Sequence, residues 1–161
     1  MNTPLRQFGV MCLTMSMVWL ADWMIKAWVI LPMPFYSSQL FLPFLTLTHV
    51  ENLGVAMSFM GSGSPLQVSV LCWIEAIGAT GLMFWWLHSL VRQRFQLAWI
   101  AAWMFLGAAM NASDRWMHGA VTDYLAFHLG AYAWPAIVNI ADLAITFSMM
   151  AYFIYCKKMS K

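Results

Sequence analysis

The sequence predicts an all-α membrane protein with four transmembrane helices and a small extracytoplasmic β-sheet. Composition is the first observation: 63% of the 161 residues are hydrophobic and 9% are charged, whereas about a quarter of the residues are charged in soluble proteins. The second is length, because a membrane crossing needs roughly 20 apolar residues and the chain contains four such segments. The third is residues 35–64, where Pro, Gly and alternating Thr and Val interrupt the apolar runs.

The first predicted span covers residues 8–31. Arg6 before an apolar run is typical of a signal peptide, but no A-x-A-like cleavage site follows, so we expect a retained helix. Asp22 and Lys26 are four residues apart and project from one helix face, where they can neutralise each other. A structural ion pair that fixes this helix to its neighbours is favoured over direct chemistry.

The outer loop, residues 35–64, has the pattern of short strands. Residues 45–50, LTLTHV, alternate with a period of two, and Asn52 and Gly54 indicate a turn. A strand pair alone is only marginally stable. We therefore expect a small sheet that lies against the helices or the membrane interface.

The remaining predicted spans cover residues 66–91, 95–111 and 135–156. Pro135 is suited to the first turn of a helix, so we expect it to open the last span. Glu75 interrupts the second span and has three interpretations. It is protonated and hydrogen-bonded inside the bundle, it pairs with Lys26, or it takes part in a proton relay.

Basic residues indicate the orientation. Six of the eight Lys and Arg lie in the two terminal tails and in the loop between the second and third spans: Arg6, Arg92, Arg94, Lys157, Lys158 and Lys161. With four spans these regions share one side of the membrane, and the positive-inside rule makes that side cytoplasmic. We expect both termini in the cytoplasm.

The polar residues of interest gather in the opposite, outer half of the predicted spans. They are Asp22, Lys26, Asn52, Asn111, Asp114, Arg115, Asp123, Asn139 and Asp142. An ionisable group near hydrocarbon is costly and is therefore a functional-site hypothesis. The charge rule and this polar cluster together predict an active site at the outer membrane boundary.

Asp123 and Asp142 are the candidate catalytic residues. A folded bundle can bring the two together, and neighbouring carboxylates cannot both ionise easily, so one holds a proton while the other accepts one. Aspartic proteases use this arrangement to activate a water for attack on an amide. The alternative is that both acids are simply solvated at the interface; the clustering on one side favours function.

Other chemistries fit less well. The four His lack metal-ligand spacing, the serines match no triad pattern, and no Gly-rich phosphate loop is present. A net charge of +2 does not suggest nucleic acid as a partner. We expect no metal and no cofactor, and we expect the three cysteines to be small core residues: Cys12, Cys72 and Cys156.

Five short motifs carry a resemblance that covers nearly the full length of the chain. They are Asp22 with Lys26, NLGVAMSF from Asn52, GAAMNASDR with Asn111, Asp114 and Arg115, VTDY with Asp123, and VNIADLAI with Asn139 and Asp142. In order and spacing they resemble the motifs of bacterial lipoprotein signal peptidases, the type II signal peptidases. Five motifs in register are far more specific than any one of them.

The resemblance implies that residues 1–161 form a single integral membrane peptidase domain. It would remove the signal peptide from prolipoproteins before the diacylglyceryl-modified cysteine, as a monomer among the lipids of the bacterial cytoplasmic membrane. The resemblance makes Asp123 and Asp142 the catalytic dyad. It implies that a second group binds substrate or supports the dyad, namely Asn52, Gly54, Asn111, Arg115 and Asn139, and that Asp22, Lys26 and Asp114 are structural.

The resemblance also implies an outer cradle formed by the loop sheet, and a small interfacial helix after Asp123. The sequence departs from the family pattern beside several of these positions: Met57, Met110, Thr122, Tyr124 and Val138. Met110 is the most consequential, because the glycine usual there permits close backbone approach.

Two other functions compete with the peptidase. A four-helix transporter would use Asp22, Lys26, Glu75 and Asp142 as a polar path, but it should distribute ionisable groups over the membrane depth. A protein that binds lipid-modified peptides without cutting them would not depend on the two aspartates.

Overall fold

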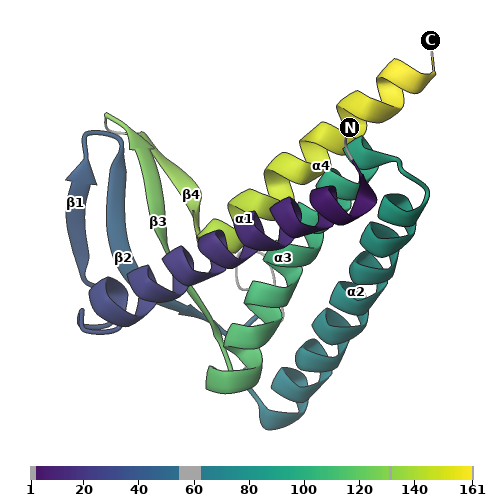
Figure 1. The fold of residues 1–161 in the computed structure, drawn as a ribbon. Helices are drawn as coiled ribbons and strands as arrows, with labels where there is room; N and C mark the ends of the chain where they lie inside the picture. The colour runs from purple at the N-terminus through teal and green to yellow at the C-terminus, as the bar shows by residue number, and fades with distance from the viewer. Residues whose placement is uncertain (1–2, 55–62, 131, 161) are drawn as a thin grey trace.

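Four long helices form the body of the molecule, and a four-stranded sheet lies at one end of them (Figure 1). The computed structural model describes residues 3–54, 63–130 and 132–160. The helices are α1 (Pro4–Ile25), α2 (Pro65–Val91), α3 (Phe95–His118) and α4 (Ile140–Met159), and α1 continues into a π-helical turn, η1 (Lys26–Ile30). Each is long and apolar enough to cross a membrane. The prediction of four membrane-spanning helices is confirmed.

The helices pack through small and flexible side chains. Helices α2 and α3 lie side by side, and α3 also contacts α4 and α1. Ala98, Ala101 and Ala102 of α3 are buried in the shared core, together with Met11 and Trp86 from α1 and α2. Small residues let helix backbones approach closely. The outer faces keep large apolar side chains exposed, as contact with lipid requires.

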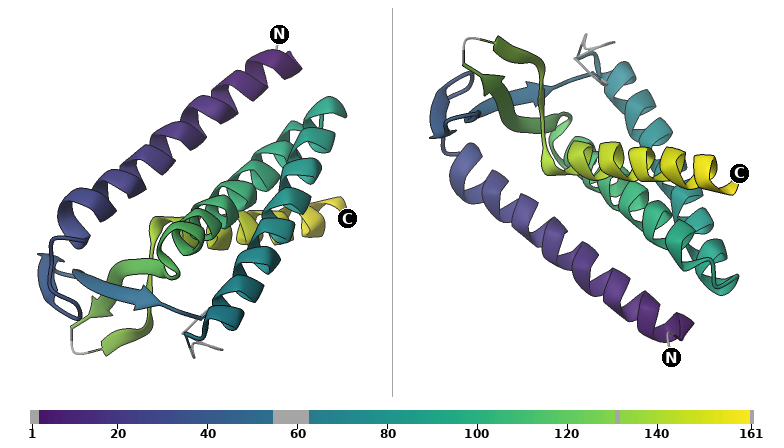
Figure 2. Two further views of the ribbon diagram at one scale, coloured as in Figure 1. Left: turned by 90° about the horizontal axis from the view of Figure 1, so that it is seen from below. Right: turned by 90° about the horizontal axis from the view of Figure 1, so that it is seen from above.

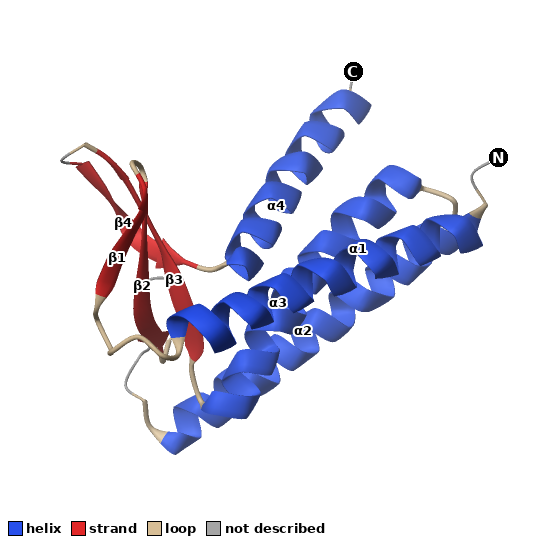
Figure 3. Cartoon of the chain, turned by 60° about the vertical axis from the view of Figure 1, so that its left-hand side comes forward, coloured by secondary structure: helices blue, strands red, loops and turns tan. Residues whose placement is uncertain are grey.

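The sheet is antiparallel, with strand order β1-β2-β3-β4. Its strands are β1 (Ser38–Leu42), β2 (Leu45–Asn52), β3 (Val121–Leu129) and β4 (Tyr132–Val138). A second core cluster joins the sheet to the end of α1 and contains Ile30, Met33, Leu45, Tyr124 and Leu125. The strand expected at residues 45–50 is part of β2, and the sheet leans on the helices as predicted. Figure 3 shows the sheet beyond the ends of the helices.

The segment after Asp123 corrects two expectations. It forms the β3–β4 hairpin rather than a short interfacial helix, and Pro135 lies within β4 rather than opening α4. Residues 121–125 are all buried, so β3 lacks the alternating pattern that marks a half-exposed strand. Helix α4 instead begins after Asn139, whose side chain caps it.

Helix α3 runs further than the predicted span of residues 95–111. It ends at His118, and Gly119 follows with φ of +79°, a conformation in which glycine commonly terminates helices. The extension keeps Asp114 and Arg115 on the helix, in its last two turns.

Both termini lie at the end of the helices away from the sheet, as does the α2–α3 connection (Figures 1 and 2). The regions that carry six of the eight basic residues therefore share one end of the molecule. The sheet and the polar residues of interest lie toward the other end.

Candidate active site

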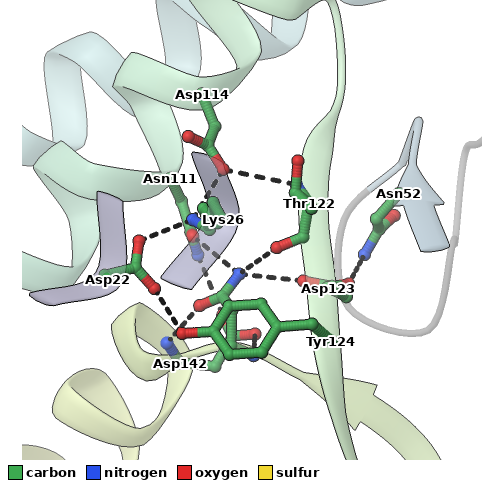
Figure 4. A network of polar contacts seen from close by, with 10 residues as sticks. Asp22, Lys26, Asn52, Asn111, Asp114, Thr122, Asp123, Tyr124 and Asp142 are labelled. Carbon is green, nitrogen blue, oxygen red and sulfur yellow. Dashed lines mark hydrogen bonds and ion pairs between the residues drawn. The ribbon is translucent and has the colours of Figure 1, made fainter. Parts of the chain in front are cut away.

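A polar cavity lies where α2, α3 and α4 meet the sheet. Its volume is about 280 Å³, and both candidate aspartates line it. The polar or charged lining residues are Asn52, Glu75, Asn111, Arg115, Asp123 and Asp142. Five elements that are distant in sequence thus bring the predicted dyad and most of its predicted supporting residues to one space. Figure 4 shows part of this network from close by.

Asp123 lies near the start of β3 and is 4% exposed. Its Oδ1 accepts a hydrogen bond from Asn139 Nδ2 at 2.8 Å, and its Oδ2 accepts one from Asn52 Nδ2 at 3.0 Å. The strand register explains the second contact. Asn52 is paired with Val121, and Asp123, two residues further along β3, is its diagonal neighbour on the same face.

Asp142 lies in the first turn of α4. Asn139 and Asp142 form a capping box, in which Asp142 Oδ2 accepts from the Asn139 backbone N–H at 3.1 Å and Asn139 Oδ1 accepts from the Asp142 N–H at 2.9 Å. Asp142 Oδ1 accepts from Asn111 Nδ2 at 2.8 Å. Because Asn139 also donates to Asp123, one fully buried amide links the two acids.

The environment of Asp123 favours its protonated form. Burial raises the pKa of the Asp123 carboxyl to about 7, and the negative charge of Asp142 adds to this rise. Hydrogen bonds from Asn52 and Asn139 and the charge of Lys26 oppose the rise in pKa without cancelling it. A large share of the Asp123 carboxyl groups therefore still carries a proton near neutral pH, beside a second carboxyl group.

A buried ionic network adjoins Asp123 on the side of α1. Lys26 Nζ lies 2.7 Å from Asp22 Oδ2 and 2.7 Å from Asp114 Oδ2, so the expected pair between Asp22 and Lys26 is present and includes a third member (Figure 4). Asp114 also accepts from the Thr122 N–H at 3.3 Å. The network joins α1 and α3 to the strand that carries Asp123.

Arg115 is buried against the loop that follows β2. It donates from Nε to Glu75 Oε1 at 3.0 Å, from Nη1 to the Asn52 carbonyl at 3.3 Å and from Nη2 to the Gly54 carbonyl at 2.6 Å. Glu75 therefore pairs with Arg115 and not with Lys26. Forty residues separate Glu75 from Arg115, and no spacing rule connects two helices at that distance, so sequence reasoning did not find the pair.

Comparison with known proteins decides the family. Residues 14–158 match the family model described as signal peptidase (SPase) II. The chain belongs to the signal peptidase II family. It is 35% identical to the lipoprotein signal peptidase of Pseudoalteromonas atlantica, covering 87% of this chain and 85% of that one. It is 39% identical to that of Vibrio parahaemolyticus, covering 88% of this chain and 84% of that one.

Two solved structures share the fold of this signal peptidase II family member. Both are described as bacterial membrane enzymes, and each superposes with a TM-score of 0.73. They are 23% and 24% identical in sequence and cover 95% and 92% of this chain. The chain is thus a multi-pass membrane protein of a peptidase family, with four apolar helices and a small sheet.

The structure shows what surrounds three of the residues that depart from the signal peptidase II pattern. Met110 is 2% exposed and packs in the helix core, so a long side chain fills the place where the family usually has glycine. Tyr124 donates its hydroxyl hydrogen to Asp22 Oδ1 at 2.7 Å, an additional bond to the Lys26 network. Val138 packs against the sheet core. Met57 lies outside the described residues.

The site of this signal peptidase II family member contains carboxylates, amides and one guanidinium. Within the described part of the chain, no three His, Cys, Asp or Glu residues are grouped so that they could hold a metal ion. The groups in the cavity can bind a peptide backbone, hold a water and exchange protons.

Proposed function

We propose that the protein is a membrane aspartic endopeptidase that removes the signal peptide from prolipoproteins before the diacylglyceryl-modified cysteine. One observation carries the proposal: Asp123 and Asp142 line the same cavity, and Asn139 is hydrogen-bonded to both. The environments of the two acids differ, because Asp123 lies in a buried strand and Asp142 in the first turn of a helix. The relatives called lipoprotein signal peptidases support the choice of substrate.

The two acids take different roles in this mechanism. Asp142 accepts hydrogen bonds from Asn111 and from the Asn139 backbone, and it lies at the N-terminal end of α4, where the helix dipole favours an anion. It is therefore the base. Asp123, whose pKa is raised to about 7, is the acid.

Hydrolysis then proceeds without a covalent intermediate. Asp142 removes a proton from water, whose oxygen attacks the scissile carbonyl carbon while Asp123 protonates the carbonyl oxygen. When the tetrahedral intermediate collapses, the C–N bond breaks and the proton on Asp142 passes to the leaving amine. Asp123 recovers its proton from the newly formed carboxyl group. Both acids return to their starting states.

Small residues leave room in the cavity for the substrate beside the scissile bond. Gly78, Ala79 and Ala108 belong to its lining, so little space is taken by the protein's own side chains on α2 and α3. A substrate anchored in the bilayer reaches this cavity by lateral diffusion. The lipid chains on the cysteine keep the scissile bond near the membrane surface.

The proposed location is the bacterial cytoplasmic membrane, with both termini in the cytoplasm and the sheet and active site on the outer face. Grouping of the basic tails with the α2–α3 connection at one end of the molecule supports this orientation. We propose a single peptidase domain that acts as a monomer.

The structure gives less support to a transporter. Asp22 and Lys26 join Asp114, and Glu75 joins Arg115, so the proposed path residues are divided between two clusters near the sheet. A binding protein without catalysis would keep its phenotype when either aspartate is replaced. A peptidase would not.

The proposal is tested with purified protein and a diacylglyceryl-modified precursor. Mass spectrometry of the products should show a new N-terminus at the lipid-modified cysteine. The same precursor without the lipid is the control, and we expect it to be cleaved much more slowly. An inert wild-type protein on several modified precursors, or cleavage at another bond, would refute the assignment.

A further inference from the structure

Glu75 is the only acidic residue of α2 and lies within a membrane-spanning segment. With Gly78, Ala79 and Leu82 it forms the face of α2 that lines the cavity. A charged group in an apolar helix is destabilising unless a partner compensates it. Arg115 is that partner, but neither acid of the proposed dyad contacts Glu75 directly among the contacts of the described residues.

Arg115 is the centre of a three-way junction. Its side chain is 2% exposed and binds three acceptors, from α2, from the last residue of β2 and from the loop that follows β2. The carbonyls of Asn52 and Gly54 carry only partial charges, whereas an ionised Glu75 beside Arg115 carries a full one. Because the guanidinium is rigid and planar, the bond from Nε to Glu75 fixes the directions of Nη1 and Nη2.

Asn52 connects this junction to Asp123 in the candidate active site. The Asn52 carbonyl accepts from Arg115 at 3.3 Å, and its side-chain amide donates to Asp123 Oδ2 at 3.0 Å. Asn52 Oδ1 also accepts from the Gly54 N–H at 3.0 Å, which makes the loop a compact turn. If the Arg115 side chain rotated away, the carbonyls of Asn52 and Gly54 would lose their hydrogen bonds. The side-chain amide of Asn52 would then no longer be held in its orientation toward Asp123.

We propose that Glu75 is a positioning residue of the peptidase: it holds Arg115 in the orientation that keeps Asn52 hydrogen-bonded to Asp123. This inference rests on the proposed function. The hydrogen bonding of Asp123 then depends on Glu75, although the two acids are not in contact. The effect passes from Glu75 to Arg115, from Arg115 to Asn52 and from Asn52 to Asp123.

The first test compares Glu75→Leu with Glu75→Gln in the precursor-cleavage assay. Leucine removes the acceptor for Arg115 Nε, and we expect kcat/KM to fall by about tenfold or more, the scale of one hydrogen bond to a charged group. Glutamine keeps an oxygen acceptor and should recover much of that loss. Thr80→Val is the matched control, because Thr80 is on the same helix and donates only to the carbonyl of Ala76 among the contacts of the described residues.

The second readout is the pH profile of kcat/KM. The charged groups that act on Asp123 are Asp142 and Lys26, and Glu75 and Arg115 lie across the same cavity. The Asn52 hydrogen bond lowers the pKa of Asp123. Its loss in Glu75→Leu should therefore move the alkaline limb of the profile to higher pH, a change that a general loss of folded protein would not produce.

The third readout is a double-mutant cycle with Asn52→Ala. If Glu75 acts through Asn52, adding Glu75→Leu to Asn52→Ala should reduce kcat/KM much less than it does in the wild type. Full additivity, or an unchanged alkaline limb, would overturn the inference. If Glu75→Leu does not fold, Glu75→Asp provides the same test, because the shorter side chain withdraws the acceptor while keeping the charge.

These outcomes separate two failures. A wild-type protein that cleaves no modified precursor refutes the proposed function itself. A wild-type protein that cleaves normally, with Glu75→Leu indistinguishable from Thr80→Val, refutes only the role of Glu75.

Discussion

At the residue scale, the site depends on amides as much as on acids. Asn139 caps α4 with its oxygen and donates to Asp123 and Asn111 with its nitrogen. A serine at this position would retain the cap but not the two side-chain donations. The two functions of Asn139 can therefore be separated experimentally.

We predict that Asn139→Ser and Asn139→Ala both lose activity by about a hundredfold or more, the contribution of a well-positioned acid–base system. Only Asn139→Ala should also lose helix stability, by about 1 kcal/mol, because alanine cannot cap. Thermal unfolding in detergent and cleavage kinetics measure the two effects. Equal unfolding temperatures for the two variants would contradict the capping role.

The pH dependence follows from Asp123. Its pKa is raised to about 7, and it is the acid in the mechanism we propose, so activity should fall as pH rises through that value and the proton is lost. We predict an alkaline limb of kcat/KM near pH 7 in the wild type. Asn52→Ala should move this limb upward, since the amide hydrogen bond lowers the pKa. A profile that is flat between pH 6 and pH 9 would contradict the assignment.

Sequence reasoning could identify residues and the local pair of Asp22 and Lys26, but not the contacts between side chains from distant segments. The aspartates and asparagines lie in short motifs of recognisable spacing, and insertion cost marks charged residues in apolar segments. The partners of Glu75 and Tyr124 are Arg115 and Asp22, residues far away in the sequence. Such contacts depend on how helices and strands pack, which no local pattern contains.

At the element scale, α3 and α4 approach closely beside the site. A Cβ added to Gly107 would lie 2.4 Å from the Ala141 carbonyl oxygen and 2.6 Å from Ile145 Cγ1. Asp142 follows Ala141 directly, so the position of the proposed base depends on this crossing. Only a residue without a side chain permits the contact.

We predict that Gly107→Ala displaces α4 and reduces both stability and activity. Overpacking at a tight site costs about 1–3 kcal/mol, and a shift of Asp142 should lower kcat as well. Gly81→Ala is the control, because a Cβ there meets no atom within 4 Å, and alanine should be neutral or slightly stabilising. A Gly107→Ala protein with wild-type kcat and unfolding temperature would contradict the argument.

Hydropathy predicts the apolar helices well, since each element that crosses a bilayer must be long and continuous. It does not predict the β3–β4 hairpin. The first half of β3 is buried on both faces and β4 contains Pro135, so neither shows the alternation expected of a strand. Pro135 is as suitable for an edge strand as for a first helical turn. A helix start at Pro135 is therefore too early, and α4 begins at Ile140.

At the scale of the whole molecule, most of the basic residues lie at the end opposite the candidate active site. The termini and the α2–α3 connection are at one end, and the sheet, whose strands β2 and β3 contribute residues to the cavity, is at the other. This asymmetry predicts a single orientation in the membrane. In the orientation we propose, the cavity lies toward the outer face of the membrane, the side where exported precursors are found.

We predict that Gln39→Cys, an exposed position of β1, reacts with a membrane-impermeant maleimide added to intact spheroplasts. Cys156, exposed near the C-terminus, should react only after the membrane is permeabilised. Labelling of Cys156 from outside, with protection of residue 39, would reverse the proposed orientation.

The most direct test of the central claim is the rate of precursor cleavage by Asp123→Asn and Asp142→Asn, each compared with the wild type. Both replacements keep the size of the side chain but remove its ability to exchange a proton in the dyad. We predict that each variant remains folded and loses about a hundredfold to ten-thousandfold in kcat. Full activity in either folded variant would show that the two aspartates do not form a catalytic pair.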